Sequence, residues 1–488
     1  MASVDHDRDV TLLSESKPSG SASMLSCVLN LCNTIMGTGI LALPYALAGT
    51  GTVLGGVFLA LSGSACIFSL HLLCEAARTI GRPATFYSVC ESAFPRLSLV
   101  VDLLIVFNGF LACETFLIVA GDSFSKLFED GPSRQVWTLV SLGCVAPLSL
   151  LRRLDALKFT SALSVLVLLL ISTIVILFSL GVDTPLLQPC GPHETSAQCH
   201  GPVASVGKPV GIVRSFATFV VAFTCQQNIF NCTNEMRDPT PRRCLMMICL
   251  AIGLATLLYG VVGYAGYATF GAFVQSDILE TYPQGNDLVF VARLGMGLVV
   301  ITCYPLQAYA LRMSVGTLLD AVCQARCLSA AADTEPPTEC TVPPESVASA
   351  DAPSVAAADA PSAAIVTAID EAAPPTSEAP SCGVLGRVFV LDSRSLGIVA
   401  ALLVLNTALA LNVSKLGIIV DINGSLNGTS ITFIVPGLVY YLLHPGRRRG
   451  ATGMLAVGVA LLGVVIVPVS LVAAFLPAAA ASANATAA

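Results

Sequence analysis

The sequence has few charged residues, and this shortage excludes a soluble globular protein. Only 11% of the 488 residues are charged and 55% are hydrophobic, whereas about 25% of the residues of a soluble domain are charged. The apolar residues form long runs such as Val165–Leu180 and Leu455–Phe475. A helix needs roughly 20 residues to cross a bilayer. The pattern therefore predicts an integral membrane protein.

Motifs for catalysis and for nucleic-acid binding are also missing. The chain has five histidines, no HExxH pair, no paired catalytic carboxylates on one helix face and no Ser/His/Asp set. We therefore expect no enzyme, no cofactor and no metal. No basic patch interleaved with aromatic residues suggests a nucleic-acid partner. Most of the 18 cysteines lie in apolar segments, where cysteine behaves as a small hydrophobic residue.

The apolar segments predict an all-α membrane protein with about eleven transmembrane helices. Residues 1–23 are polar and acidic and resemble no signal peptide, so we expect them to form a cytosolic tail. The expected spans are Met24–Leu47, Gly51–Ala77, Leu99–Ser123, Val136–Leu151, Phe159–Gly181, Pro209–Phe230, Leu245–Phe270, Asp287–Leu311, Ser395–Leu411, Gly417–Leu443 and Leu455–Leu476.

A long segment between the eighth and ninth spans is rich in Ala, Pro, Ser, Glu and Thr. Such a composition buries too little apolar surface to offset its ordering entropy. We expect residues 317–384 to form a disordered cytosolic linker. It separates helices 1–8 in residues 24–316 from helices 9–11 in residues 385–476, and residues 477–488 form a C-terminal tail.

The basic residues between the spans predict the orientation. With the N-terminus inside, every inside segment is richer in Lys and Arg than every outside segment, and the cluster Arg447–Arg449 lies inside. This is the positive-inside pattern. We expect a cytosolic N-terminus and a C-terminus outside or in a lumen.

The loop 182–208 then faces outward, where disulfides can form. We predict a disulfide between Cys190 and Cys199. A zinc site made of these two cysteines with His193 and His200 is one alternative, and two free thiols are the other.

Two spans carry interruptions at matching positions of two five-helix halves. Gly37-Thr38-Gly39 breaks the first span, with Asn33 before it and Pro44 one turn later, and Thr224-Cys225-Gln226-Gln227-Asn228 makes the sixth span polar. Paired interrupted helices point to a transporter binding site. Freed backbone N–H groups suit a carboxylate, and freed carbonyls suit a cation or an ammonium group. The alternative is that these glycines have no binding role and only permit close packing of the helices.

Charged residues within the spans are a second signal, since such residues are costly and usually face the bundle interior. Glu114 in the third span and Arg293 in the eighth lie at similar depths. We expect them to pair or to share a water-filled cavity, either as a structural ion pair or in ion coupling. The polar start of the tenth span, 421–430, should pack into the bundle or line an outer vestibule.

Four segments together resemble the amino acid/auxin permease family. They are NLCNTIMGTGILALPYALAGTG (30–51), FTCQQNIFNCTNEMRDPTPRR (223–243), NDLVFVARLGMGLVVITCYPLQ (286–307) and GSLNGTSITFIVPGLVYYL (424–442). The resemblance covers almost the whole chain outside the tail and the linker. It implies a LeuT-type fold of five plus five inverted-repeat helices with an eleventh appended, and alternating access around a site between the first, sixth and eighth helices.

The resemblance also implies roles for particular residues. The backbone amides of Gly37, Thr38 and Gly39 would hold the substrate carboxylate, and Asn33 would contribute to substrate and cation binding. Cys225 and Gln226 would border the side-chain pocket.

The eighth span departs from the pattern of the sodium-coupled relatives. Those relatives have a Thr two residues before the proline, whereas Pro305 is preceded there by Cys303, with Thr302 one position off. One residue turns a helical side chain by about 100°. The coupling ion is therefore sodium or a proton, with Asn33, Thr302, Cys303 and Glu114 as candidate residues.

The function expected from these features is secondary active transport of small neutral L-amino acids by a monomer embedded in the lipid bilayer. A nutrient sensor that binds an amino acid with little flux is the alternative, because the same site would serve both. The plasma membrane and a vacuolar or lysosomal membrane both fit.

Overall fold

The computed structural model describes residues 20, 22–37, 39–128, 131–150, 158–181, 184–191, 199–332, 393–413 and 416–475. The chain divides into two compact units, Met1–Leu318 with Val390–Ala488, and Leu319–Phe389. Of the second unit, the structure describes only the C-terminal part of helix α13. Everything below concerns the first unit unless stated otherwise.

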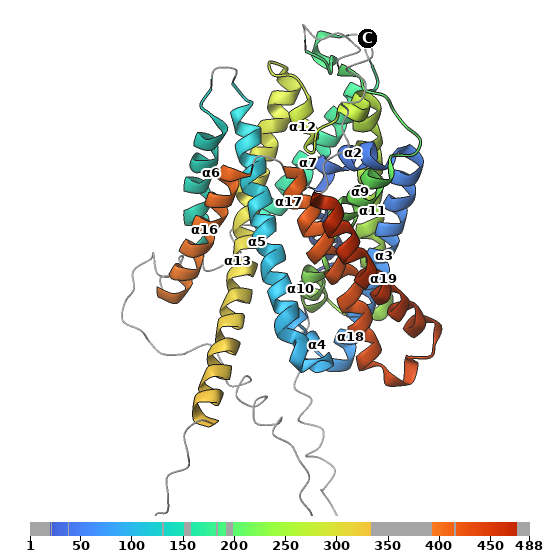
Figure 1. Cartoon of the computed structure of the whole chain (residues 1–488), viewed down its shortest axis with the longest axis vertical. Coiled ribbons are helices and arrows are strands. Elements are labelled where there is room, and N and C mark those ends of the chain that lie inside the picture. The colour runs from blue at the N-terminus through green and yellow to red at the C-terminus, as the bar shows by residue number, and fades with distance from the viewer. Residues whose placement is uncertain are drawn as a thin grey trace, which may run out of the picture. The chain divides into compact units, whose positions relative to one another are not determined.

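The described residues form helices that follow the expected spans in order (Figure 1). The first half contains α1 (Met24–Ile35), α2 (Gly39–Thr50), α3 (Thr52–Ile80), α4 (Phe86–Ala93), α5 (Pro95–Ser125), α6 (Arg134–Ser149) and α7 (Lys158–Ser179). The second half contains the short helix η2 (Pro185–Leu187), α9 (Pro209–Ala222), η3 (Gln226–Asn228), α10 (Ile229–Glu235), α11 (Pro241–Phe270), η4 (Gly271–Phe273), α12 (Ile278–Thr281) and α13 (Asp287–Ala332).

The last part of the chain contains the ninth to eleventh expected spans. It comprises α16 (Ser393–Asn412), α17 (Leu416–Asn423), the π-helical turns η5 (Gly424–Gly428) and η6 (Ser430–Ile434), α18 (Val435–Leu443), η7 (Pro445–Arg447) and α19 (Ala451–Phe475). The elements α17 to α18 run as one span over Leu416–Leu443.

Eight of the described helical segments are long and apolar enough to cross a membrane, and the bent pair α1–α2 gives a ninth. The expected fourth span corresponds to α6, which has 16 residues, and the apolar part of α7 is Leu163–Ser179. Both are shorter than the usual crossing length. The all-α membrane class is confirmed, while the count of eleven spans stays a prediction.

The segment expected to be a linker begins as helix. Helix α13 continues past Gly316 to Ala332. The sequence there, TLLDAVCQARCLSAAA, is rich in Ala and Leu, which are strong helix formers. Residues 333–392, which hold the rest of the expected linker, lie outside the described residues.

Burial separates interior spans from peripheral ones. In the span Leu416–Leu443, 67% of the most apolar window is buried, against 17% in Ser393–Asn412 and 22% in Ala451–Phe475. The polar tenth span therefore packs inside the bundle, as expected, and the ninth and eleventh face outward. Helix α11 packs against α1, α2, α3 and α7, and α2 packs against α9. The two interrupted spans thus lie together, beside α11.

Candidate functional site

The first span breaks where the glycines stand. Helix α1 ends at Ile35, and the N–H of Met36 still donates to the carbonyl of Cys32 at 2.8 Å. The helix resumes at Gly39, bent by 54° from α1. The first N–H groups of α2 have no acceptor within their own helix, and they carry the positive end of the helix dipole. Thr38 lies outside the described residues.

The sixth span breaks at the matching place. Helix α9 ends at Ala222, Cys225 departs from helical geometry with φ −142° and ψ 11°, and the chain passes through η3 before α10 begins. The side chain of Thr224 donates back to the carbonyl of Val220 at 3.1 Å. The break is therefore held by local side-chain and backbone bonds.

The hydroxyl of Tyr259 on α11 joins the two breaks. It lies 2.8 Å from the carbonyl oxygen of Ala222, the last residue of α9, and also within hydrogen-bond distance of the carbonyl of Ile35, the last residue of α1. Its single proton can be donated to only one carbonyl at a time. Gly39 allows the start of α2 to pack closely against the end of α9, because a Cβ there would lie only 3.2 Å from the Cα of Ala222.

A second side-chain hydrogen bond joins the first span to the sixth span near the two breaks. The amide Nδ2 of Asn228 in η3 donates to the hydroxyl of Thr34 on α1 at 2.7 Å. Gly37 is different, since no atom of the described residues, its chain neighbours apart, lies within 4 Å of the place that a Cβ would take there. The break in the first span therefore borders open space, while the chain on either side is tightly held.

The other predicted binding residues lie at two places. Asn33 is half-buried on α1. Cys225 and Gln226 are buried against α3: the sulfur of Cys225 lies 3.9 Å from that of Cys66, and the Nε2 of Gln226 lies 3.5 Å from the hydroxyl of Ser69. The Oε1 of Gln226 accepts the N–H of Cys225 at 2.9 Å. These side chains fix the sixth-span break to α3.

The tenth span packs against the first part of the broken sixth span. Its turn η5 packs against α9, and a Cβ at Gly424 would lie 2.2 Å from the carbonyl of Ala217, so only glycine permits this approach. The hydroxyl of Ser425 and the Oδ1 of Asn427 are buried without a hydrogen-bond partner among the described residues. π-Helical turns occur often at functional sites.

An ion pair that the sequence analysis did not predict ties the sixth span to the tenth. The Nε of Arg214 on α9 lies 2.5 Å from a carboxylate oxygen of Asp421 on α17, and the Thr218 hydroxyl donates to the other oxygen at 3.2 Å. The sequence did contain a sign of this ion pair, since each of the two residues is the one charged residue in its apolar segment. What the sequence did not supply was the proximity of the two spans.

The two coupling candidates of the eighth span contact different partners. Thr302 donates to carbonyls of its own helix, Leu298 at 3.0 Å and Val299 at 2.9 Å. Cys303 has its sulfur 3.4 Å from the hydroxyl of Ser164 on α7. The side chain at the position two before Pro305 therefore faces α7.

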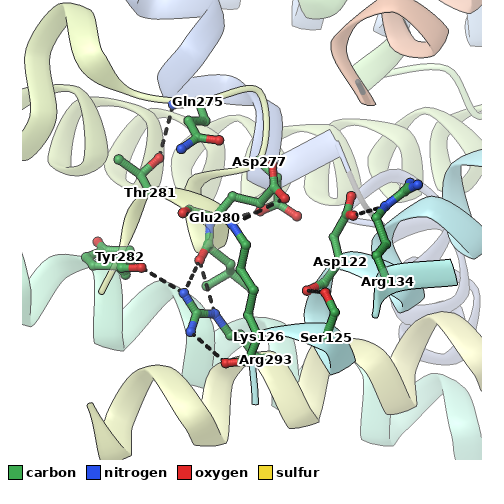
Figure 2. A network of polar contacts seen from close by, with 11 residues as sticks. Asp122, Ser125, Lys126, Arg134, Gln275, Asp277, Glu280, Thr281, Tyr282 and Arg293 are labelled. Atoms are coloured by element: carbon green, nitrogen blue, oxygen red, sulfur yellow. Dashed lines mark hydrogen bonds and ion pairs between the residues drawn. The ribbon is translucent and has the colours of Figure 1, made fainter. Parts of the chain in front are cut away.

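Glu114 and Arg293 do not form the expected ion pair. Arg293 donates instead to three backbone carbonyls, those of Leu279, Tyr282 and Lys126, at 2.7 to 3.3 Å (Figure 2). These carbonyls satisfy its guanidinium where α12 meets α13. Glu114 on α5 is fully buried, and within the described part of the chain neither of its oxygens has a hydrogen-bond partner.

The loop between α7 and α9 contains a disulfide. Cys190 and Cys199 are joined, with their Cα atoms 5.7 Å apart, and the ring of His200 is bonded to the carbonyl of Thr269. Both sulfurs are used by the disulfide and are not thiolate ligands. His193, the fourth member of the alternative zinc set, lies outside the described residues.

The comparisons with known proteins decide the family. The family of transmembrane amino acid transporter proteins matches residues 20–479. The chain belongs to this family. It is a transporter and not an enzyme, as the sequence analysis predicted.

Relatives within the family are similar over most of the chain. Vacuolar amino acid transporter 6 of Saccharomyces cerevisiae is 29% identical over 86% of this chain and 90% of its own length. Vacuolar amino acid transporter 5 of Schizosaccharomyces pombe is 31% identical over 61% of this chain and 70% of its own length. Putative sodium-coupled neutral amino acid transporter 11 of Danio rerio is 28% identical, with 62% and 66% covered.

A solved structure shows the same fold. Mhp1, a nucleobase-cation-symport-1 family transporter in a closed conformation with bromovinylhydantoin bound, superposes with a TM-score of 0.53 at 13% identity. The superposition covers 94% of this chain and 91% of Mhp1. The likeness confirms the expected LeuT-type fold for this amino acid transporter.

Proposed function

We propose that the chain is a secondary active transporter that moves small neutral L-amino acids across a membrane by alternating access, coupled to protons or sodium. The observation that supports this most is the meeting of the two broken spans at Tyr259, next to the open space at Gly37. A break in a membrane helix is tolerated where it is buried in protein or lines a cavity.

The two ends of an amino acid fit the two kinds of helix end at this place. The amides of Gly37, Thr38 and Gly39 at the start of α2 would hold the carboxylate, where the helix dipole is positive. Carbonyl groups at the end of α1 or α9 would accept hydrogen bonds from the ammonium group. Asn33 would add a polar contact, and Cys225 and Gln226 would shape the side-chain pocket through their contacts with α3.

Glu114 is the best-supported coupling residue. A fully buried carboxylate without a partner is costly, so such a group holds a proton or a cation. Cys303 replaces the threonine of the sodium-coupled relatives and contacts α7, while the hydroxyl of Thr302 is bonded within its own helix. These contacts favour a proton over sodium, with Asn33 as the remaining candidate for a cation contact.

The vacuolar relatives support a vacuolar or lysosome-like membrane as the location. With the N-terminus in the cytosol, the loop that carries the disulfide would face the lumen, and the arginine clusters would face the cytosol.

The test is uptake of a panel of radiolabelled amino acids by liposomes that contain the purified chain. A pH gradient and a sodium gradient are imposed separately. We expect a neutral amino acid to accumulate under the pH gradient. Binding without accumulation under either gradient would indicate a sensor and contradict the proposal.

A further inference from the structure

A cavity lies between α3, the loop that follows α3, α10 and α11. Its volume is about 230 Å³, and its polar lining consists of His71, Glu75, Arg78, Arg82, Thr233 and Asn234. No residue of α1 or α2 lines it. The cavity is therefore not the proposed substrate site, although α10 is the second half of the sixth span.

The cavity has an uncompensated positive charge. Glu75 is its one acidic lining residue, and this carboxylate already pairs with Arg78 at 2.9 Å and with Arg447 at 3.7 Å. Arg82 makes no ion pair with any residue that the structure describes, and its Nη2 is buried without a hydrogen-bond partner there. A buried, unsatisfied guanidinium nitrogen is costly, and an anion in the cavity would satisfy it.

The loop that carries Arg82 is held in place. The side chain of Asn234 on α10 bonds both the N–H of Ala84 at 3.2 Å and its carbonyl at 2.7 Å. Arg82 is thus presented by a fixed loop and not by a free chain end. An ordered loop loses less backbone entropy on binding than a mobile one.

We propose that this cavity binds a phosphate group, either in the headgroup of a phosphorylated lipid or in a soluble phosphate compound. The guanidinium of Arg82 matches phosphate oxygens with two parallel N–H donors. Arg78, shared with Glu75, and His71 stand on the neighbouring helix α3. Basic pockets between membrane helices at the cytosolic side are known sites for lipid phosphates.

Two arms of one binding experiment separate the sources. In the first arm, the full chain in detergent is dialysed against radiolabelled inorganic phosphate. In the second, the chain in phosphatidylcholine nanodiscs, with and without phosphatidylinositol phosphate, is analysed by native mass spectrometry for retained lipid. Binding in the first arm indicates a soluble ligand, and binding only in the second indicates a lipid headgroup. Either result supports the site if it depends on Arg82.

The variant Arg82→Gln should weaken binding by at least about tenfold, which corresponds to the loss of one charge-assisted contact. Arg237→Gln is the matched control: it removes the same charge next to the end of α10, from a side chain that is 75% exposed and outside the cavity lining. We expect it to bind as the wild type does. If Arg82→Gln does not fold, Arg82→Lys, which keeps the charge but loses the two-pronged donor, should still weaken binding.

Absence of binding in both arms would overturn the proposal. Equal losses in Arg82→Gln and Arg237→Gln would also overturn it, because they would show attraction to the general charge of this surface. Neither readout involves transport, so the outcome is independent of the function proposed above.

Discussion

The hydroxyl of Tyr259 lies 2.8 Å from the carbonyl oxygen of Ala222, where helix α9 stops. The same hydroxyl reaches the carbonyl of Ile35, where α1 stops. One side chain of α11 therefore holds the ends of both broken helices, and the open space at Gly37 lies beside them. Rearrangement of either break must change this contact.

The variant Tyr259→Phe should weaken the junction without opening a cavity. Two buried carbonyls lose their shared donor, which costs about 1–2 kcal/mol of unfolding free energy. About 1.4 kcal/mol added to the barrier of the transport cycle lowers its rate tenfold, so we expect uptake in liposomes to fall by up to about tenfold. Tyr264→Phe, at an exposed position of the same helix α11, is the control, because its hydroxyl donates to the carbonyl of Thr52 at the start of α3 and not to a broken helix. Equal uptake by the two variants would contradict the role of Tyr259.

The ion pair of Arg214 and Asp421 should behave as a buried pair. The side chain of Asp421 is 1% exposed and that of Arg214 is 14% exposed. Removing one partner, in Arg214→Gln or Asp421→Asn, should cost about 3–5 kcal/mol of unfolding free energy, because the other charge is left buried.

A double-mutant cycle from melting curves measures this coupling. The double variant should be less destabilised than the sum of the two single variants. The exposed pair of Arg237 and Asp238, 4.0 Å apart, serves as the control and should show no measurable coupling. Additive single effects at Arg214 and Asp421 would show that the pair contributes nothing.

Glu114→Gln tests the coupling residue. The amide has nearly the same shape but cannot carry a proton or a charge. We expect counterflow exchange of the substrate to persist, while accumulation driven by an ion gradient is lost. Asp287→Asn, an exposed carboxylate at the start of α13, is the control and should accumulate substrate normally. Gradient-driven accumulation by Glu114→Gln would remove Glu114 from the coupling mechanism.

Asp277 predicts a pH-dependent stability. It lies between α11 and α13, outside the membrane-crossing segments, and its carboxylate accepts the N–H of Leu279 at 2.8 Å. Burial, and next the nearby Glu280, raise the pKa of Asp277 to about 7 (Figure 2). The unfolded chain loses this proton near pH 4. Between about pH 4 and pH 7 the folded state therefore binds more protons, so its stability falls as the pH rises through this window.

The measurement is thermal unfolding in detergent at pH 5 and at pH 8. The wild type should lose more stability on going to pH 8 than Asp277→Asn, which keeps an acceptor for Leu279 but cannot ionise. The same pH dependence in both proteins would show that another group is responsible.

The sequence predicted the helices and the break of the first span, because both depend on local properties. Gly37 and Gly39 lower helix propensity wherever they stand, and the length of an apolar run is visible directly. The prediction of an ion pair between Glu114 and Arg293 was wrong, because similar depth does not show which groups face each other; the alternative, a shared water-filled cavity, stays a prediction. Arg293 is satisfied by the backbone carbonyls of Leu279 in α12, of Tyr282 directly after it and of Lys126, and no periodicity revealed the short helix α12.

Tyr259 could not be predicted for a related reason. Nothing in α11 marks it as different from its neighbours Tyr264 and Tyr267, and its role depends on where α1 and α9 end in space. Asp421 and Arg214 were visible as charges in apolar spans, but their pairing depends on the packing of the sixth span against the tenth.

Uptake by the variant Gly37→Val tests the central claim most directly. A valine side chain there would enter the space that the substrate is proposed to occupy, and its Cβ would have no atom of the described residues within 4 Å apart from its chain neighbours. Gly253→Val, at an equally open but outward-facing position of α11, is the control. We predict that Gly37→Val folds with an unchanged melting temperature and neither binds nor accumulates the amino acid that the wild type and Gly253→Val accumulate. Undiminished uptake by Gly37→Val would contradict a substrate site between the broken helices.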